Sequence, residues 1–316
     1  MASRAPVRRA HLGMLAWALL VGLSFPIVGR LGELPPLSLT ALRFAIACLG
    51  LWALVRRTPE AWPERCAWPW LVAMGACLAG FFGAMFWAAH HATALSMSTL
   101  YVSVPLLAYG MGLAVGVERL AWRLPAILAL GALGALGLAG AEAWQRGGQW
   151  RFGAGEAVFF LGCLCSALYP VLSRRGLVAG HLPASAAVRT FWSLALGGVL
   201  VGALGLALEP VARLATMSGR DALLIVYLGL GSSALTFWLM QRATAVLGPA
   251  SITAYGYLVP FVSMLWLFAE TPSRLDWVWL PGSALVVLAI GLLLAGGEEG
   301  ADDGHAGAAE GGEGRG

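Results

Sequence analysis

The sequence predicts an all-α polytopic membrane protein with about ten transmembrane helices, arranged as two inverted five-helix repeats. Three observations support this fold class: the composition, the number of long apolar stretches, and an internal repeat. Of the 316 residues, 59% are hydrophobic and only 11% are charged, whereas a soluble domain averages roughly 45–50% apolar and about 25% charged residues. The chain has too few charges to cover a globule of this size in water, so we expect it to lie in lipid.

The apolar stretches are long enough to serve as membrane spans, which need roughly 20 residues. Short connections rich in Pro, Gly and Arg separate them. The predicted spans are 11–30, 37–55, 68–89, 93–115, 123–142, 154–174, 184–207, 221–241, 246–269 and 276–295. This gives a cytoplasmic N-terminus (1–10), a first repeat (11–142), a loop (143–153), a second repeat (154–295) and a disordered acidic tail (296–316), because the tail has nothing to bury.

An internal repeat relates the two halves of the chain. The segment Ala88–Trp122 matches Ala243–Trp277 at an offset of 155 residues. The coinciding pairs include Ser96 with Ser251, Val104-Pro105 with Val259-Pro260, and Arg119-Leu120 with Arg274-Leu275. Each half holds five spans, and since five is odd, the second half enters the membrane from the opposite side. Inverted repeats of this kind are the usual architecture of secondary transporters.

The placement of arginine predicts the orientation in the membrane. With the N-terminus inside, eleven arginines fall in cytoplasmic loops and six in outer loops. The cytoplasmic set is Arg4, Arg8, Arg9, Arg56, Arg57, Arg65, Arg119, Arg123, Arg174, Arg175 and Arg242. The outer set is Arg30, Arg146, Arg151, Arg213, Arg220 and Arg274. We therefore expect a multi-pass protein of the inner or plasma membrane with both termini in the cytoplasm.

Short motifs follow one another in a similar scheme in the two halves. The first half contains Trp17 with Gly22, Pro35-Pro36, Arg43-Phe44, Val104-Pro105 and Glu118-Arg119-Leu120. The second half repeats the scheme with Tyr169-Pro170, Arg189 and Val259-Pro260. In this order they resemble the EamA-like members of the drug/metabolite transporter superfamily. That resemblance implies ten helices, two halves around a central substrate cavity, and transport of small metabolites, often outward. One departure is Ser273, where the family's second unit has Glu; Glu270 lies about one turn earlier.

Polar residues and prolines within the spans are the candidates for a substrate pathway, because polar groups in lipid usually face a cavity or another helix. Ser96, Thr99 and Ser103 are spaced to share one face of a helix, and helix packing is an equally good reading of that face. Pro105 and Pro260 should each kink their helix. The remaining candidates on the pathway are Trp17, Tyr101, Trp238, Tyr255 and Tyr257.

Three charged residues could serve either the structure or substrate binding. Arg43 and Arg189 lie a few residues inside their spans, where an arginine can reach the headgroups or meet an anionic group of a substrate. Glu118 is expected to cap a helix or to pair with Arg119 or Arg123. His90-His91 suits a single metal poorly, since adjacent helical side chains point about 100° apart. We predict no metal and no cofactor.

The predicted function is secondary transport, with export of small metabolites or drug-like compounds through a central cavity by alternating access. A polytopic membrane enzyme is one alternative, but no paired carboxylates, H-E-x-x-H or G-x-S-x-G motif occurs. A membrane assembly component without transport is another, since the glycine ladder from Gly131 to Gly140 could join helices or form a homodimer. The expected partners are a small-molecule substrate and the lipid bilayer; scattered arginines speak against nucleic acid.

Overall fold

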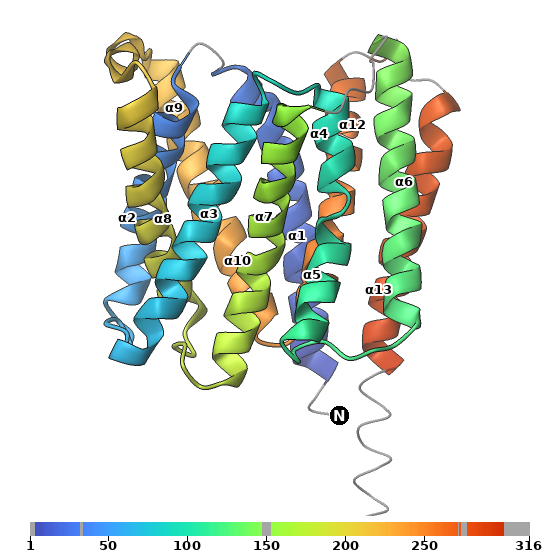
Figure 1. The fold of residues 1–316 in the computed structure, drawn as a ribbon, viewed down its shortest axis with the longest axis horizontal. Helices are drawn as coiled ribbons and strands as arrows, with labels where there is room; N and C mark the ends of the chain where they lie inside the picture. The colour runs from blue at the N-terminus through green and yellow to red at the C-terminus, as the bar shows by residue number, and fades with distance from the viewer. Residues whose placement is uncertain (1–3, 32–33, 147–152, 271, 273–276, 300–316) are drawn as a thin grey trace, which may run out of the picture.

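A computed structural model shows long helices lying side by side (Figure 1) and describes residues 4–31, 34–146, 153–270, 272 and 277–299. Within this part, nine helical spans are long and apolar enough to cross a membrane. A further helix of 26 residues, α1 (Arg4–Gly29), packs among them. The spans are built from α2 (Pro36–Val55), α3 (Trp68–Ala88), α4 (Ala94–Tyr101), α5 (Val104–Ala114), α6 (Arg123–Arg146), α7 (Ala154–Val178), α8 (Ala186–Leu208), α9 (Gly219–Tyr227), η3 (Leu228–Leu235), α10 (Thr236–Thr244), α11 (Pro249–Ala254), η4 (Tyr255–Tyr257), α12 (Leu258–Glu270) and α13 (Leu280–Glu299). The predicted fold class is confirmed.

Packing between the helices follows the sequence repeat. Two of the contacts join a helix to its own repeat mate: α2 with α8, and α6 with α13. Other contacts come in mated pairs, namely α3 with α7 and α10 with α1, α3 with α8 and η3 with α2, and α5 with α7 and α12 with α1. Such a set of contacts is what a pseudo-two-fold axis between inverted repeats produces. The contact of α5 with α11 has no counterpart of comparable extent in the described part of the chain.

Carboxylates from one half cap the N-termini of helices in the other half. Glu209, just after α8, accepts the backbone N–H groups of Leu37 (2.7 Å) and Ser38 (2.9 Å) at the start of α2. Glu60, shortly after α2, accepts the N–H of Ser185 (3.1 Å), the residue that precedes α8. The first N–H groups of a helix lack partners within it, so these carboxylates satisfy donors that would otherwise be costly near lipid. The mated helices α2 and α8 therefore cap one another.

Several helices extend beyond the predicted boundaries. The N-terminal segment becomes helical at Arg4, the helix of the fifth span continues to Arg146, and α13 runs on to Glu299, although the tail was predicted to begin at 296. Pro6 lies in the first turn of α1, where proline is tolerated, and the extensions of α6 and α13 contain no proline, so helical hydrogen bonding carries on beyond the apolar run. Residues 300–316, most of the predicted tail, lie outside the described residues.

Glycines bring α6 and α13 into backbone contact. A Cβ atom built at Gly134 would lie 2.7 Å from the backbone nitrogen of Val286, and one built at Gly282 would lie 2.8 Å from the carbonyl oxygen of Gly134. Gly131 approaches the ring of Tyr257 just as closely. Small residues at such crossings are typical of membrane helices, where close packing supplies much of the association energy. The ladder thus packs within the chain, and a homodimer stays a prediction.

We expect Gly134→Ala to destabilise the protein, because the added methyl group meets backbone atoms that cannot rotate away. Gly140→Ala is the matched control in the same helix, since a Cβ there meets nothing within 4 Å. By helix propensity alone either change would stabilise by about 1 kcal/mol. Thermal unfolding in detergent should show a lower midpoint for Gly134→Ala and an equal or higher one for Gly140→Ala. Equal midpoints for the two variants would contradict the tight crossing.

Candidate functional site

The fourth and ninth spans are interrupted at equivalent positions. Between α4 and α5, Val102 and Ser103 form a turn in which the Ser103 N–H donates to the carbonyl of Leu100 (3.0 Å). Between α11 and α12, the chain tightens into the 3₁₀ turn η4. Pro105 and Pro260 lie in the first turn of the helix that follows each break, where proline's missing N–H costs least. Each proline therefore follows a short turn that interrupts the regular α-helical hydrogen bonding while the backbone keeps right-handed helical angles.

The predicted hydroxyl face spans the turn between α4 and α5. Ser103 precedes α5, and its Oγ donates to the Leu100 carbonyl (2.6 Å). Val102 and Ser103 both keep right-handed helical backbone angles, so Ser96, Thr99 and Ser103 belong to one membrane span. Ser96 is buried in the first turn of α4, where its N–H is capped by Thr93 Oγ1 (3.1 Å). A role of this face in a substrate pathway stays a prediction.

The two breaks touch each other. The hydroxyl of Tyr257 donates to the carbonyl of Val102 at 3.3 Å, and a Cβ built at Gly256 would lie 3.7 Å from the Tyr101 ring. Both pairs are 155 residues apart, the offset of the sequence repeat, so equivalent positions of the two halves meet. This meeting point, formed by Tyr101, Val102, Gly256 and Tyr257, is called the junction below.

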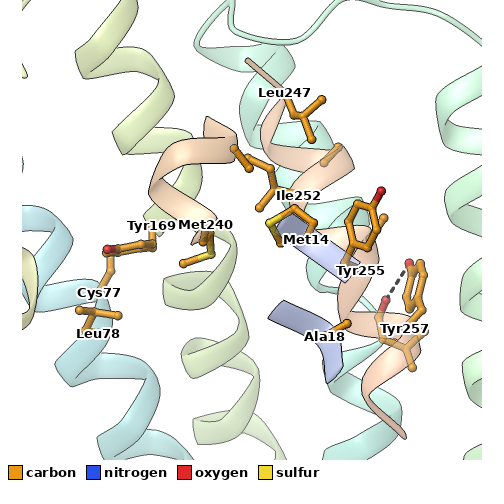
Figure 2. Close-up of a cluster of buried hydrophobic side chains, with 14 of the residues drawn as sticks. Met14, Ala18, Cys77, Leu78, Tyr169, Met240, Leu247, Ile252, Tyr255 and Tyr257 are labelled. Carbon is orange, nitrogen blue, oxygen red and sulfur yellow. Dashed lines mark hydrogen bonds between the residues drawn. The ribbon is translucent and has the colours of Figure 1, made fainter. Parts of the chain in front are cut away.

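Helix α1 borders the junction. Figure 2 places Met14 and Ala18 of α1 beside Tyr255 and Tyr257, and the Tyr255 hydroxyl lies 2.7 Å from Nδ1 of His11. Tyr255 and Tyr257 are both buried. The predicted pathway residues Tyr101, Tyr255 and Tyr257 are thus brought together with the first helix, on side chains that combine a large apolar ring with a polar tip.

The other predicted pathway residues differ in their burial and in their neighbours. Trp238 packs with Val55 and Val188, and Arg242 sits 4.8 Å above its ring. Pro260 is exposed, whereas Pro105 is buried. Trp17 is half-buried against the core of the bundle, and Thr99 is half-buried on α4.

Arg189 is fully buried in a network of hydrogen bonds that the sequence did not reveal. Its Nε donates to Oε1 of Gln241 (3.1 Å) and its Nη2 to the Gln241 carbonyl (2.7 Å), while Nη1 donates to the carbonyls of Pro183 (2.5 Å) and Ala184 (2.8 Å). Gln241 Nε2 in turn donates to the hydroxyl of Tyr169 (2.9 Å). The one signal for Gln241 was a lone amide at the end of an apolar span.

Glu118 joins the two halves near one end of the bundle. Its Oε1 accepts the N–H of Ala250 (2.9 Å) in the first turn of α11, and a Cβ at Gly248 would overlap the carboxylate. Gly116, with φ +74°, lets the chain turn back toward α11. Glu118 therefore caps a helix, as one of the expected readings had it, but a helix of the opposite half.

Glu270 occupies a related place at the opposite end of the bundle. Its Oε1 forms an ion pair with Arg30 at 2.9 Å. Arg30 is the repeat mate of Arg174, whose charge acts on Glu118. Glu270 and Glu118 are thus each associated with an equivalent arginine, Arg30 and Arg174. Ser273, the position that matches Glu118 in the repeat, lies outside the described residues.

Contacts around the junction are tighter on one side of the bundle than on the other. On the Glu118 side, α11 packs against α5, α7 and α10. Repeat symmetry predicts equivalent contacts of α4 with α12, α1 and α3 at the opposite side, but none of comparable extent joins these helices in the described part of the chain. At that side α4 packs instead against α6 and α7. The described conformation therefore brings α5 and α11 together toward Glu118 without an equivalent approach of α12 and α4.

Among the described residues, no group of three or more His, Cys, Asp or Glu is arranged to hold a metal ion. His90 and His91 are exposed in the turn after α3, and each Nδ1 lies near a carbonyl one turn back, at 3.0 Å and 2.8 Å. An apolar groove of about 640 Å³ opens between α2 and α8, lined by Leu49, Trp52 and Val199 among others. Neither feature includes the residues of the junction.

These observations define a multi-pass membrane protein of two inverted repeats whose interrupted helices meet in the interior, which is the architecture of secondary transporters. The sequence profile of the EamA-like transporter family matches residues 8–140 and 153–295. The chain belongs to this family and is a membrane transporter of the drug/metabolite transporter superfamily.

Similarity to solved structures supports the same fold. A crystal structure described only as "Crystal structure of protein" is 22% identical, covers 90% of this chain and 95% of its own, and superposes with a TM-score of 0.74. At this identity the likeness concerns the fold. No curated protein matches the chain in sequence.

We expect Arg189→Met to be severely destabilising. The change leaves the side-chain and backbone oxygens of Gln241, which are buried, without these donors, and each unsatisfied buried group costs about 1–3 kcal/mol. It also removes the bonds to the carbonyls of Pro183 and Ala184. Unfolding in mixed micelles should show a loss of at least about 3 kcal/mol. Arg175→Met, at an exposed arginine in the last turn of α7, is the control and should change stability little; equal losses would argue against the network.

Glu118 should make stability depend on pH. Burial raises the pKa of Glu118 above its ordinary value of 4.5, although the Ala250 N–H and Arg174 act in the opposite direction. The folded protein then retains a proton that the unfolded chain releases, so this contribution to stability is complete below about pH 4.5 and declines as pH rises through the folded-state pKa. Glu118→Gln should flatten the decline in a series of thermal unfolding curves; an unchanged pH profile would contradict the assignment.

Proposed function

We propose that the protein is a secondary transporter that exports small metabolites or drug-like compounds by alternating access at the junction. The observation that carries this proposal is the hydrogen bond between Tyr257 and the carbonyl of Val102. Interrupted helices that meet at the interface of two repeats are where transporters of inverted-repeat design bind their cargo. A substrate that inserts between the two breaks would replace this contact.

Alternating access is supported by the unequal packing at the two ends of the bundle. The α11 side is closed by α5 and by the Glu118 cap, while the mated helices at the α4 side pack less closely. By the symmetry of the repeats, the second state closes α4 against α12 and releases α11 from α5. Each half would then take the role that its mate has in the present state, and the junction would open alternately to the two sides.

The distribution of arginines favours a cytoplasmic location for both termini. Arg119, Arg174 and Arg242 then lie on the cytoplasmic side together with Glu118, so the closed end of the described conformation faces the cytoplasm. We place the protein in the inner or plasma membrane, and we propose a small molecule as its substrate.

We expect Tyr257→Phe to alter transport while leaving the fold intact. The variant loses one hydrogen bond of about 1 kcal/mol, equivalent to roughly a fivefold change in the balance between states. Flux of a metabolite panel through proteoliposomes should change by about that factor for any compound carried by the unaltered protein. Tyr227→Phe is the matched control, since that ring is 40% exposed on α9.

Two results would contradict the proposal. The first is the absence of saturable flux with every compound of a broad panel in both membrane orientations. The second is equal flux for the Tyr257→Phe and Tyr227→Phe variants together with normal flux for the unaltered protein, since the junction would then have no part in transport.

A further inference from the structure

Arg43 lies deep in the membrane-spanning part of the chain. Its Cα is seven residues past Pro36, about 10 Å along α2 from the start of that helix. Its Nη2 is 3.3 Å from the hydroxyl of Ser233. Ser233 is close to the middle of the 26-residue span Gly219–Thr244, so the guanidinium points toward the centre of the bilayer rather than toward the headgroups.

The hydrogen bonding of Arg43 contrasts with that of its repeat mate. Arg189 uses all three guanidinium nitrogens on Gln241, Pro183 and Ala184. Arg43 makes only the long bond to Ser233, and its buried Nε has no hydrogen-bond partner within the part of the chain that the structure describes. No carboxylate of that part forms an ion pair with it. One repeat therefore satisfies its arginine with protein groups, and the other leaves its arginine with free donors.

The protein surface around Arg43 is shaped by an irregular helix. The segment η3 is a π-helix. This form is rare in proteins as a whole, but where it occurs it is frequently found at functional sites. Gly229 of η3 brings the two backbones together, since a Cβ there would lie 3.1 Å from the Arg43 carbonyl. Segment η3 also packs against α1, the helix beside the junction. Arg43 is thus held one helix away from Tyr255 and Tyr257.

The groups at this place select for negative charge. Arg43 offers unfilled N–H donors, and the Ser233 hydroxyl, which accepts from Arg43, keeps its own hydrogen to donate. A charged side chain in the membrane interior without a counter-charge is costly, and such residues mark substrate sites in membrane proteins. The planar guanidinium matches carboxylate and phosphate oxygens in a bidentate way that neutral ligands cannot reproduce.

We propose that Arg43, with Ser233, binds the acidic group of an anionic substrate, a carboxylate or a phosphate. This inference rests on the proposed transport function and narrows its substrate class to organic acids. The acid supplies the counter-charge that Arg43 lacks, and the rest of the molecule extends toward α1 and the junction.

The test compares acids with their uncharged amides. The probes are two acid and amide pairs, benzoate with benzamide and succinate with succinamide, and inorganic phosphate. Binding of each probe is measured by thermal stabilisation of the purified protein and by competition in proteoliposome flux. We expect an acid to stabilise the unaltered protein and its amide to do so far more weakly. Arg43→Gln should lower the affinity for that acid about tenfold or more, in keeping with the loss of a charge-assisted contact, and Arg43→Lys should restore part of it.

Arg213→Gln, at an exposed arginine of η2 (Val211–Thr216), is the control and should bind the acid normally. Arg43→Gln should also fold, since it removes an uncompensated charge; if it does not, the comparison of acid with amide on the unaltered protein and on Arg43→Lys still decides. Equal binding of acid and amide, no response to any acid, or unchanged affinity in Arg43→Gln would each overturn the proposal.

A phospholipid headgroup presents the same chemistry, so its contribution is measured separately. Stability is compared in nanodiscs of phosphatidylcholine alone and with phosphatidylglycerol, for the unaltered protein and for Arg43→Gln. Stabilisation by phosphatidylglycerol that depends on Arg43, without any response to free acids, would make this a lipid site and overturn the substrate assignment. Acid binding without flux would support the acid site and contradict the transport function. Flux of neutral compounds that does not depend on Arg43 would support transport and contradict the acid site.

Discussion

The rest of the structure depends on one constraint: backbone groups in lipid must find partners inside the protein. An interrupted helix leaves such groups free, so both interruptions can exist only where they are covered. The hydrogen bond from Tyr257 to the Val102 carbonyl meets this need by placing each break against the other. The two halves must therefore pack about this point, and α1, which carries Met14 and Ala18, closes over it (Figure 2).

Equivalent residues in the two halves have acquired different surroundings. Arg189 holds α7, α8 and α10 together through Gln241 and Tyr169, which makes it a structural residue in this conformation. Arg43 keeps unfilled donors. Glu118 caps α11, whereas Glu270 pairs with Arg30. A transporter that alternates between two states needs such differences, because perfectly symmetric halves would be closed, or open, on both sides at once.

Much of this architecture could be predicted from particular residues. The apolar runs predicted the spans, and Pro105 with Pro260 predicted that two helices would depart from regularity. Neither proline could reveal that the turn beside it would meet its counterpart in the other half, because that contact joins residues 155 positions apart. Most of the bonds of Arg189 could not be predicted, because three of its acceptors, on Pro183, Ala184 and Gln241, are backbone carbonyls, which every sequence contains.

The sequence by itself determined that the chain crosses a membrane, that it contains two copies of one unit, and that the copies are inverted. Composition and the odd number of spans decide these properties, and both are independent of contacts. Only the tertiary structure decided that the breaks touch, which helices of the two halves meet at each end of the bundle, and which arginine is left with free donors. These depend on which side chains and carbonyls come within about 3 Å of each other, and such distances arise only when helices far apart in the chain pack together.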